Sequence, residues 1–232
     1  MQHLKKVVFI LSVSLNLILL TYIAKKIFDN RNSGLSYYLD RNELFEALPT
    51  DSNSIVFIGT SLTQNFELAE FFQNLNLRNR GINGDVTEGV LARLDAILVT
   101  KPAKLFIEIG INDLGTGVQR EVVAENYKEL IRRIQNSSPD TKIYIQSLFP
   151  TQVEGGRYTT YCNKKVNDDI VFLNNELRKI TSLYKVAFID TYSSFVSDGQ
   201  LNPIYSVDGI HLNGAGYKLW AKILAPYISE PD

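Results

Sequence analysis

Short apolar runs alternate with longer amphipathic stretches along most of the chain. Four runs have the length and the aromatic or β-branched content of buried strands: residues 55–58, 104–109, 142–146 and 186–189. A weaker strand is predicted over 77–80. Apolar positions recur at helical spacing in four intervening stretches, 90–98, 123–134, 166–180 and 217–227, and a further helix is expected over 66–75.

This alternation predicts an α/β fold. Strands that alternate with helices form right-handed crossover connections and a parallel sheet that helices cover on both faces. Ligands bind to such sheets beyond the carboxyl ends of the strands. We therefore expect the functional residues in loops that follow strands, and we assign the apolar helical stripes to the core.

The N-terminal segment follows neither pattern. Residues 7–24 form an uncharged run of 18 residues with lysines on both sides, and a helix of about this length just spans the hydrocarbon core of a bilayer. A cleaved signal peptide is the alternative, but its apolar run is shorter and ends in small residues, whereas this one ends in TYIA. We expect a membrane anchor over 1–24, a polar linker over 25–36 and one globular domain over 37–232. The flanking lysines barely discriminate the orientation, and by default we place the domain outside the cytoplasm, in the periplasm or on the cell surface.

Composition and charge narrow the function. The chain carries 24 basic and 25 acidic residues, for a net charge of −1, so nucleic-acid binding, which needs a basic surface, is not expected. Cys162 is the single cysteine, which excludes a disulfide within this chain and a cysteine-based zinc site. We interpret it as a structural residue, because a thiol nucleophile needs a cation or helix end that lowers its pKa. Nothing in the sequence indicates the oligomeric state.

Polar and glycine-containing clusters follow three of the predicted strands. Gly59-Thr60-Ser61 comes directly after the first strand, at the start of a helix whose partial positive charge stabilises negative charge on reacting oxygens. Gly84 follows the weak second strand and can point its N–H into a site, and Asn112 follows the third and can donate its side-chain amide. Each cluster is also typical of a helix cap or a tight turn. For Asp113 we prefer a role as cap of the helix that follows it.

A fourth cluster pairs an acid with a histidine. Asp208 precedes His211 by three residues, in a loop before the last helix. A carboxylate at this spacing can bond to the imidazole and fix its tautomer, so that the other ring nitrogen faces a nucleophile. The only other histidine, His3, lies in the N-terminal segment, which makes His211 the candidate general base. Asp190, at the end of the last strand, is a rival orienting acid that we rank below Asp208.

Together these clusters supply a nucleophile, a base, an orienting acid and oxyanion donors, each in a loop outside the carboxyl end of a predicted strand. With them, the sequence resembles the SGNH (GDSL-type) hydrolase family, which is named for its catalytic Ser, Gly, Asn and His. Ser61, Gly84, Asn112 and His211 match those four in order, and Asp208 matches the family's Asp-x-x-His. Segments such as RGINGDVTEGVLARLDAIL and YSVDGIHLNGAGYKLWAKIL are similar to the bacterial branch related to platelet-activating-factor acetylhydrolase and lysophospholipase L1.

The resemblance covers roughly residues 44–228 and implies a flavodoxin-like three-layer α/β/α sandwich around five parallel strands. One position departs from the family, because Thr60 stands where the family has the aspartate of Gly-Asp-Ser. That acid is not the nucleophile, so we expect catalytic activity to be retained. The substitution leaves open which residue supports the serine loop in place of the aspartate. An α/β-hydrolase is not expected, because Thr63 occupies the last position of its Gly-x-Ser-x-Gly motif.

The resemblance implies a serine esterase with Ser61, His211 and Asp208 as its catalytic residues. The backbone N–H groups of Ser61 and Gly84 and the Asn112 amide form the expected oxyanion hole, and no metal or organic cofactor is needed. The small-molecule ester is left open between a lysophospholipid or other lipid ester and an O-acetylated glycan. The alternative is a membrane-tethered, non-catalytic glycan- or lipid-binding module on the same fold, which Thr60 alone supports.

The loop over residues 152–165 bears on the substrate. It contains Gly155-Gly156 and the tyrosines Tyr158 and Tyr161, with Tyr144 farther away in the sequence. Two interpretations have equal weight. The loop either forms the mouth of the site or is a solvent-exposed connection.

Overall fold

The computed structural model describes residues 2–48 and 51–230, and within its first helix it describes the side chains of residues 19–23, 25, 26, 29 and 33–47. The chain divides into two compact units, Met1–Leu44 and Phe45–Asp232. The second unit contains the sheet and every candidate residue of the predicted site.

The first unit consists of helix α1 (Gln2–Ala47), which continues into the second unit. Residues 25–36, which the sequence predicts as a polar linker, are helical. Gly34 is the one residue of that stretch with a strong intrinsic penalty in a helix, and the stretch contains no proline. Polarity alone therefore does not end a helix here.

Most of the predicted membrane anchor (1–24) lies outside the residues whose side chains are described, namely residues 1–18 and residue 24. In the part that is described, no helix has both the length and the apolar character needed to cross a membrane. The anchor and its orientation stay predictions.

The second unit is built on five parallel strands, as predicted. They are β1 (Ile55–Gly59), β2 (Leu77–Gly81), β3 (Lys104–Glu108), β4 (Lys142–Gln146) and β5 (Ala187–Ile189), in the order β2-β1-β3-β4-β5. The chain moves from β1 to one edge of the sheet and then returns to β3 on the other side of β1. Open α/β sheets bind ligands at such a reversal, beyond the carboxyl ends of the two central strands.

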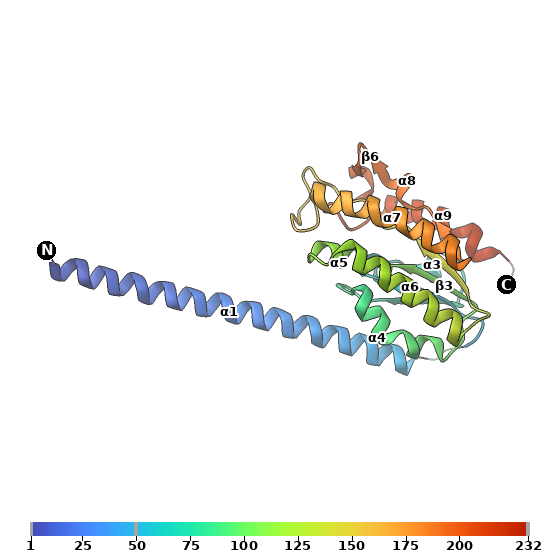
Figure 1. The fold of residues 1–232 in the computed structure, drawn as a ribbon, viewed down its shortest axis with the longest axis horizontal. Coiled ribbons are helices and arrows are strands. Elements are labelled where there is room, and N and C mark those ends of the chain that lie inside the picture. The colour runs from blue at the N-terminus through green and yellow to red at the C-terminus, as the bar shows by residue number, and fades with distance from the viewer. Residues whose placement is uncertain (1, 49–50, 231–232) are drawn as a thin grey trace. The chain divides into compact units, whose positions relative to one another are not determined.

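Helices cover both faces of the sheet, which confirms the predicted three-layer architecture (Figure 1). One face carries α4 (Thr87–Leu98), α6 (Arg120–Ser137) and α7 (Lys164–Tyr184), and its core is mostly aliphatic. The other face carries α2 (Ser61–Gln64), α3 (Leu68–Phe72) and α9 (Gly214–Ser229). The remaining elements are α5 (Ile111–Gly115), α8 (Tyr192–Phe195), the short hairpin β6 (Val196–Ser197) and β7 (Gln200–Leu201), and a 3-10 helix (Pro203–Tyr205).

The second face has an aromatic core. Phe57 stacks on Phe106 with ring centroids 4.6 Å apart, and Phe106 stacks on Tyr144 at 4.4 Å. These rings come from the adjacent strands β1, β3 and β4, so one row of aromatic side chains crosses the sheet. Tyr144 is therefore a core residue and not a neighbour of the tyrosines in the 152–165 loop.

The helix predicted over 66–75 is wrong in its extent. The chain instead forms the single turn of α2 and then α3, which starts at Leu68. Helix α3 ends where Gln73 adopts a left-handed backbone conformation with φ 48°. Apolar spacing in this stretch reflects the burial of Phe66 and Leu68 in the aromatic core and not one continuous helix.

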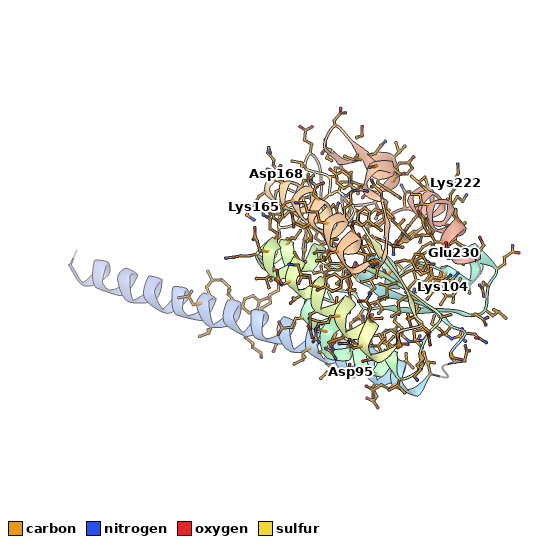
Figure 2. All side chains as sticks on the ribbon, turned by 45° about the vertical axis from the view of Figure 1, so that its right-hand side comes forward. Asp95, Lys104, Lys165, Asp168, Lys222 and Glu230 are labelled. Atoms are coloured by element: carbon orange, nitrogen blue, oxygen red, sulfur yellow. The ribbon has the colours of Figure 1, made fainter. Side chains whose placement is uncertain are left out.

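A buried lysine fastens the last helix to the sheet at the end opposite the predicted site. Lys104 begins β3, and its Nζ donates to the carbonyl oxygens of Tyr227 (3.2 Å), Ile228 (3.2 Å) and Glu230 (2.5 Å). Figure 2 labels Lys104 and Glu230 next to one another. Because a cation favours the carbonyl end of a helix, this contact caps α9 and sets its position over the sheet.

Candidate active site

Ser61 begins α2 directly after β1. The residue before it, Thr60, is fully buried, and its hydroxyl oxygen accepts the N–H of Leu62 at 3.4 Å as the helix cap. Helix α2 has only four residues, so the stabilising charge that we attribute to a helix start from the sequence is small here. Individual N–H groups at this turn matter more than a helix dipole.

Asn79 supports the serine loop in a chain that lacks the family's aspartate. Its side-chain amide nitrogen, on β2, donates to the carbonyl oxygens of Thr63 (2.6 Å) and Phe66 (3.1 Å). Its side-chain oxygen accepts the N–H of Gly81 at 2.9 Å. These bonds join α2 to the neighbouring strand, so Thr60 need not carry a charge for the loop to be held.

Two glycines let α2 approach the sheet closely. A Cβ at Gly59 would collide with the Thr63 hydroxyl and the Glu108 carbonyl oxygen, and a Cβ at Gly81 would collide with the backbone of Thr63 and Gln64. Neither obstacle at Gly81 is a movable side-chain end, since both are main-chain atoms. The glycine is required by packing and not by its backbone angles.

We expect Gly81→Ala to lower the free energy of unfolding by about 1–3 kcal/mol, because an added methyl group must push α2 away from the sheet. Urea unfolding followed by circular dichroism measures the loss. Gly214→Ala is the matched control, since a Cβ there meets nothing within 4 Å and Gly214 is helical. Equal stability of the two variants would contradict this account of the packing.

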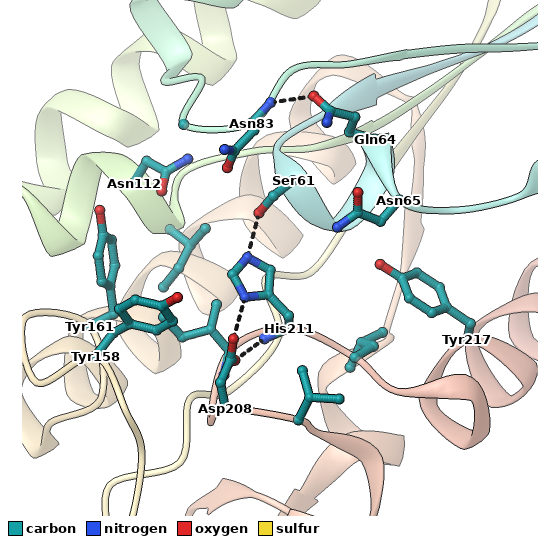
Figure 3. A pocket seen from close by; sticks show the side chains of 15 residues that line it. Ser61, Gln64, Asn65, Asn83, Asn112, Tyr158, Tyr161, Asp208, His211 and Tyr217 are labelled. Atoms are coloured by element: carbon teal, nitrogen blue, oxygen red, sulfur yellow. Dashed lines mark hydrogen bonds and ion pairs between the residues drawn. The ribbon is translucent and has the colours of Figure 1, made fainter. Parts of the chain in front are cut away.

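Ser61, His211 and Asp208 form a continuous hydrogen-bonded line (Figure 3). The Ser61 Oγ lies 2.9 Å from His211 Nε2, and His211 Nδ1 lies 2.7 Å from Asp208 Oδ2. Ser61 lies at the start of α2, and the other two residues lie in the loop before α9. Ser61 and His211 are 150 positions apart in the sequence. The structure therefore brings together the nucleophile, base and acid that the sequence predicts.

The loop that carries Asp208 and His211 is held by its own backbone. The other carboxylate oxygen of Asp208 accepts the N–H groups of Ile210 (3.0 Å) and His211 (2.9 Å). The Ser206 hydroxyl accepts the N–H of Gly209 at 2.8 Å and donates to the His211 carbonyl oxygen at 3.0 Å. These bonds, together with the contact of Asp208 Oδ2 with His211 Nδ1, fix the orientation of the imidazole.

The electrostatics of Asp208 suit an orienting acid. Burial raises the pKa of Asp208, but hydrogen bonds from the His211 ring and from the backbone N–H groups of His211 and Ile210 outweigh it. The pKa of Asp208 is therefore below its ordinary value. The side chain stays ionised at neutral pH, and only 9% of it is exposed to solvent.

The Ile82–Asp85 segment forms a tight turn beside Ser61. The Asp85 N–H donates to the Ile82 carbonyl oxygen at 3.1 Å, and Gly84 has φ +78°. Asn83 is not among the residues with positive φ, so this is a type II β-turn, in which the third position needs a glycine-like backbone. Gly84 lines the same pocket as Ser61.

Asn112 lies on the other side of this turn, at the start of α5. Its amide nitrogen donates one hydrogen to the Asp85 carbonyl oxygen at 2.8 Å, and an amide nitrogen has a second hydrogen to donate. Asp113, which the sequence suggests as the cap of the following helix, instead accepts the Thr87 N–H (3.1 Å) and the Thr87 hydroxyl (2.6 Å). It thus caps the start of α4, and it lies within α5, whose N-cap position is Gly110.

Two further candidates lie outside the hydrogen-bonded line. Asp190 bonds with Arg178 (2.9 Å) and with the Ser193 hydroxyl (2.9 Å), so it makes no contact with the histidine. Cys162 is buried, and burial raises the pKa of its thiol, which is the environment of a structural cysteine. Within the described ranges, no three His, Cys, Asp or Glu side chains gather where a metal ion could bind.

The predicted site residues line one pocket of about 600 Å³. Its wall also contains residues that the sequence does not single out: Gln64, Asn65, Asn83, Ile111, Val207, Ile210, Leu212 and Tyr217. Tyr158 and Tyr161 belong to the wall as well, and the Tyr158 ring lies edge-on to His211 with centroids 6.2 Å apart. The 152–165 loop is therefore part of the site mouth.

Tyr217 shows most clearly how a helical pattern can miss a residue of the pocket. Its position in the apolar stripe of α9 predicts a core residue, and its ring does pack on Phe66. Its hydroxyl, however, donates to the Leu62 carbonyl oxygen at 3.0 Å, and the side chain borders the pocket. A tyrosine can serve the core with its ring and the site with its hydroxyl, so spacing alone cannot separate the two roles.

Comparison with known proteins agrees with this geometry. Residues 57–219 match the GDSL-like lipase/acylhydrolase family. Over 179 residues the chain is 32% identical to platelet-activating factor acetylhydrolase IB subunit alpha2 of Homo sapiens, covering 74% of this chain and 73% of the relative. A solved structure from Streptococcus pneumoniae, described as a platelet activating factor, is 27% identical with a TM-score of 0.80 and covers 88% of this chain and 99% of its own.

A solved acetyl xylan esterase has the same fold, with a TM-score of 0.63, 20% identity and coverage of 75% of this chain and 99% of its own. The family match extends from β1 into α9, so it contains the whole hydrogen-bonded line from Ser61 to His211. The chain therefore belongs to the GDSL-like lipase/acylhydrolase family and is a carboxylic ester hydrolase.

Proposed function

We propose that the protein hydrolyses its ester through an acyl-enzyme, with Ser61 as nucleophile, His211 as general base and Asp208 as the acid that orients the histidine. The observation that carries the proposal is the unbroken pair of hydrogen bonds, 2.9 Å from Ser61 to His211 and 2.7 Å from His211 to Asp208. Both distances lie in the range required for proton transfer and for fixing a tautomer.

In the first half of the reaction, Ser61 Oγ attacks the ester carbonyl carbon and its proton passes to His211 Nε2. The ionised Asp208 stabilises the imidazolium that results, without taking the proton. Collapse of the tetrahedral intermediate breaks the bond to the leaving oxygen. His211 returns the proton to that oxygen, so the alcohol departs neutral and the acyl group remains on Ser61.

The negative charge on the tetrahedral intermediate needs hydrogen-bond donors beside Ser61. The backbone N–H groups of Ser61 and Gly84 and the second hydrogen of the Asn112 amide are the proposed donors. Removing one such donor typically lowers kcat by about 10²–10³-fold. In the second half, water attacks the acyl carbon while one of its protons passes to His211. The bond to Ser61 Oγ then breaks, His211 returns the proton to that oxygen, and the carboxylic acid leaves.

We further propose a short acyl group, such as acetyl, on an uncharged polar alcohol of the kind found in O-acetylated glycans. Acetyl removal is part of the printed name of the human relative and of the acetyl xylan esterase that shares the fold. The pocket wall offers amides and phenols, and no lysine or arginine is among the described residues that line it. An anionic phospholipid head group finds no cation in that wall.

A fluorophosphonate probe and a panel of esters test the proposal. We expect the probe to add covalently to the wild-type protein at Ser61, as found by mass spectrometry, and not to Ser61→Ala. Acetylated xylo-oligosaccharides should be hydrolysed faster than a lysophospholipid of long acyl chain. Absence of labelling, together with measurable glycan or lipid binding, would favour the non-catalytic binding module, and faster lysophospholipid hydrolysis would refute the proposed acyl and alcohol preference.

A further inference from the structure

We propose that Gln64 is a positioning residue for catalysis: its side chain holds the Asn83–Gly84 corner so that the Gly84 N–H faces the oxyanion formed at Ser61. This inference rests on the proposed acyl-enzyme mechanism. It assigns a role to a residue that contributes neither nucleophile, base nor oxyanion donor. The contact that carries it is a hydrogen bond of 2.8 Å from the Asn83 N–H to Gln64 Oε1 (Figure 3).

The direction of the Gly84 N–H depends on one peptide unit. In a type II turn the peptide between the second and third residues is rotated by about 180° relative to a type I turn with the same ends. Here that peptide joins Asn83 to Gly84, and Gly84 has the positive φ that the type II form requires. A rotation of this unit would turn a proposed oxyanion donor away from Ser61 without changing the rest of the loop.

The ends of the turn are fixed independently of Gln64. At the first residue, the Ile82 N–H donates to the Gly59 carbonyl oxygen at 3.0 Å, which continues the ladder between β1 and β2. At the last residue, the Asp85 carboxylate forms a buried ion pair with Arg93 at 2.8 Å, and its carbonyl oxygen accepts from Asn112. Gln64 acts between these fixed ends: it accepts the N–H of the Ile82–Asn83 peptide unit and so restrains Asn83, the residue about whose ψ angle the next unit, Asn83–Gly84, would rotate.

Gln64 also ties this corner to the nucleophile. It lies one helical turn after Ser61 in α2, so the same rigid turn carries the attacking oxygen and the group that restrains the donor. Asn79 fastens that turn to β2 through the Thr63 carbonyl oxygen at 2.6 Å. The bond from Asn83 to Gln64 therefore sets the spacing between nucleophile and donor, which electrostatic stabilisation of an oxyanion requires to be preorganised.

The expected effect is smaller than the loss of a donor, because the Gly84 N–H remains and is only less well aimed. Asn83 is exposed and Gln64 partly exposed, so water competes for the bond. We expect Gln64→Met, which keeps the length of the side chain and removes the accepting oxygen, to lower kcat for p-nitrophenyl acetate about tenfold, against the about 10²–10³-fold for a missing donor. KM should change less than about twofold, since ground-state binding is unaffected.

Two further measurements separate positioning from a structural role. The affinity for a trifluoromethyl ketone, which forms a tetrahedral oxyanion on the serine, should fall by the same factor as kcat. Gln64→Ala should repeat the loss, which excludes an effect peculiar to the methionine. Gln135→Met is the matched control, because it removes an exposed side-chain bond to a backbone carbonyl, 2.9 Å to Tyr184, far from the pocket, and should leave kcat unchanged.

An unchanged kcat in Gln64→Met overturns the inference. A rise in KM with an unchanged kcat also overturns it, because Gln64 would then be a substrate contact. A fall in the thermal midpoint of Gln64→Met without the matching loss of ketone affinity also overturns it. Failure of the proposed mechanism is distinguishable, since the wild-type protein would then neither hydrolyse the ester nor react with a fluorophosphonate.

Discussion

Asp208→Asn is expected to lower kcat for ester hydrolysis by about 10⁴-fold, because the asparagine amide stabilises the wrong histidine tautomer and cannot stabilise an imidazolium. The fold of the loop should survive. An asparagine side-chain oxygen can still accept the N–H groups of Ile210 and His211, which hold the loop at 3.0 and 2.9 Å. The loss is therefore specific to the contact with His211 Nδ1.

Asp190→Asn is the matched control for this prediction. Asp190 is the rival acid of the sequence, and its partners are Arg178 and Ser193 and not the histidine. Single-turnover hydrolysis of an activated acetyl ester by both variants, with circular dichroism to verify folding, measures the difference. If Asp190→Asn lost as much activity as Asp208→Asn, or if Asp208→Asn kept near-normal activity, the assignment of the orienting acid would be wrong.

The architecture is predictable from the sequence because the spacing of apolar positions differs clearly between strands and helices. Buried strands of a parallel sheet are continuous apolar runs. Strands β3, β4 and β5 lie within the predicted segments, and β1 extends one residue beyond its segment, to Gly59. The weak strand β2 was harder to see, since it lies at the sheet edge and reads LRNRG. Its polar side chains are explained by their contacts, because Asn79 in its centre bonds to the backbone around α2.

The candidate catalytic residues are predictable from the sequence, but the residues that hold them in position are less so. Ser61, Gly84 and Asn112 follow from motifs that come after strands, and Asp208 and His211 follow from their spacing in the loop before the last helix. All five line one pocket. What surrounds them depends on which side chains reach across the sheet edge, and one-dimensional spacing carries no such information. The bonds from Asp113 to the start of α4 are an example.

Short helices are the other limit of a sequence pattern. A stretch such as 66–75 can show apolar spacing while its backbone turns away after five residues, as α3 does. Gln64 falls in the same region, and its role depends on a contact with Asn83 that is 19 positions away. A signal for that contact exists only in three dimensions, where two loops at neighbouring strand ends meet.

A buried carboxyl group at the end of β3 carries the second large prediction. Glu108 is 1% exposed, and among the residues that the structure describes its Oε2 has no hydrogen-bond partner. Burial raises the pKa of Glu108 from its ordinary value of 4.5 to about 8, because the charged form loses its hydration without gaining a cation. We therefore expect the side chain to be mostly protonated in the folded protein at neutral pH.

The sign of the pH dependence follows from the two states. Between pH 4.5 and about 8, the folded protein keeps a proton on Glu108 that the unfolded chain releases. Rising pH therefore favours the unfolded state, by at most about 1.4 kcal/mol for each pH unit, and the contribution becomes constant above the folded-state pKa. The contribution of the neutral Glu108 carboxyl to the free energy of unfolding is fully present at low pH and is lost as the pH rises from 4.5 to about 8.

Glu108→Gln removes this dependence, because the amide is neutral at every pH. We expect the stability of the variant relative to the wild type to increase by about 2–4 kcal/mol between pH 5 and pH 8, as measured by urea unfolding at several pH values. Glu129→Gln is the control, since a hydrogen bond with Arg132 lowers the pKa of Glu129, and its effect therefore falls below this window. A constant difference between Glu108→Gln and the wild type across the range would mean that Glu108 is already ionised in the folded protein, with a cation or water that satisfies it.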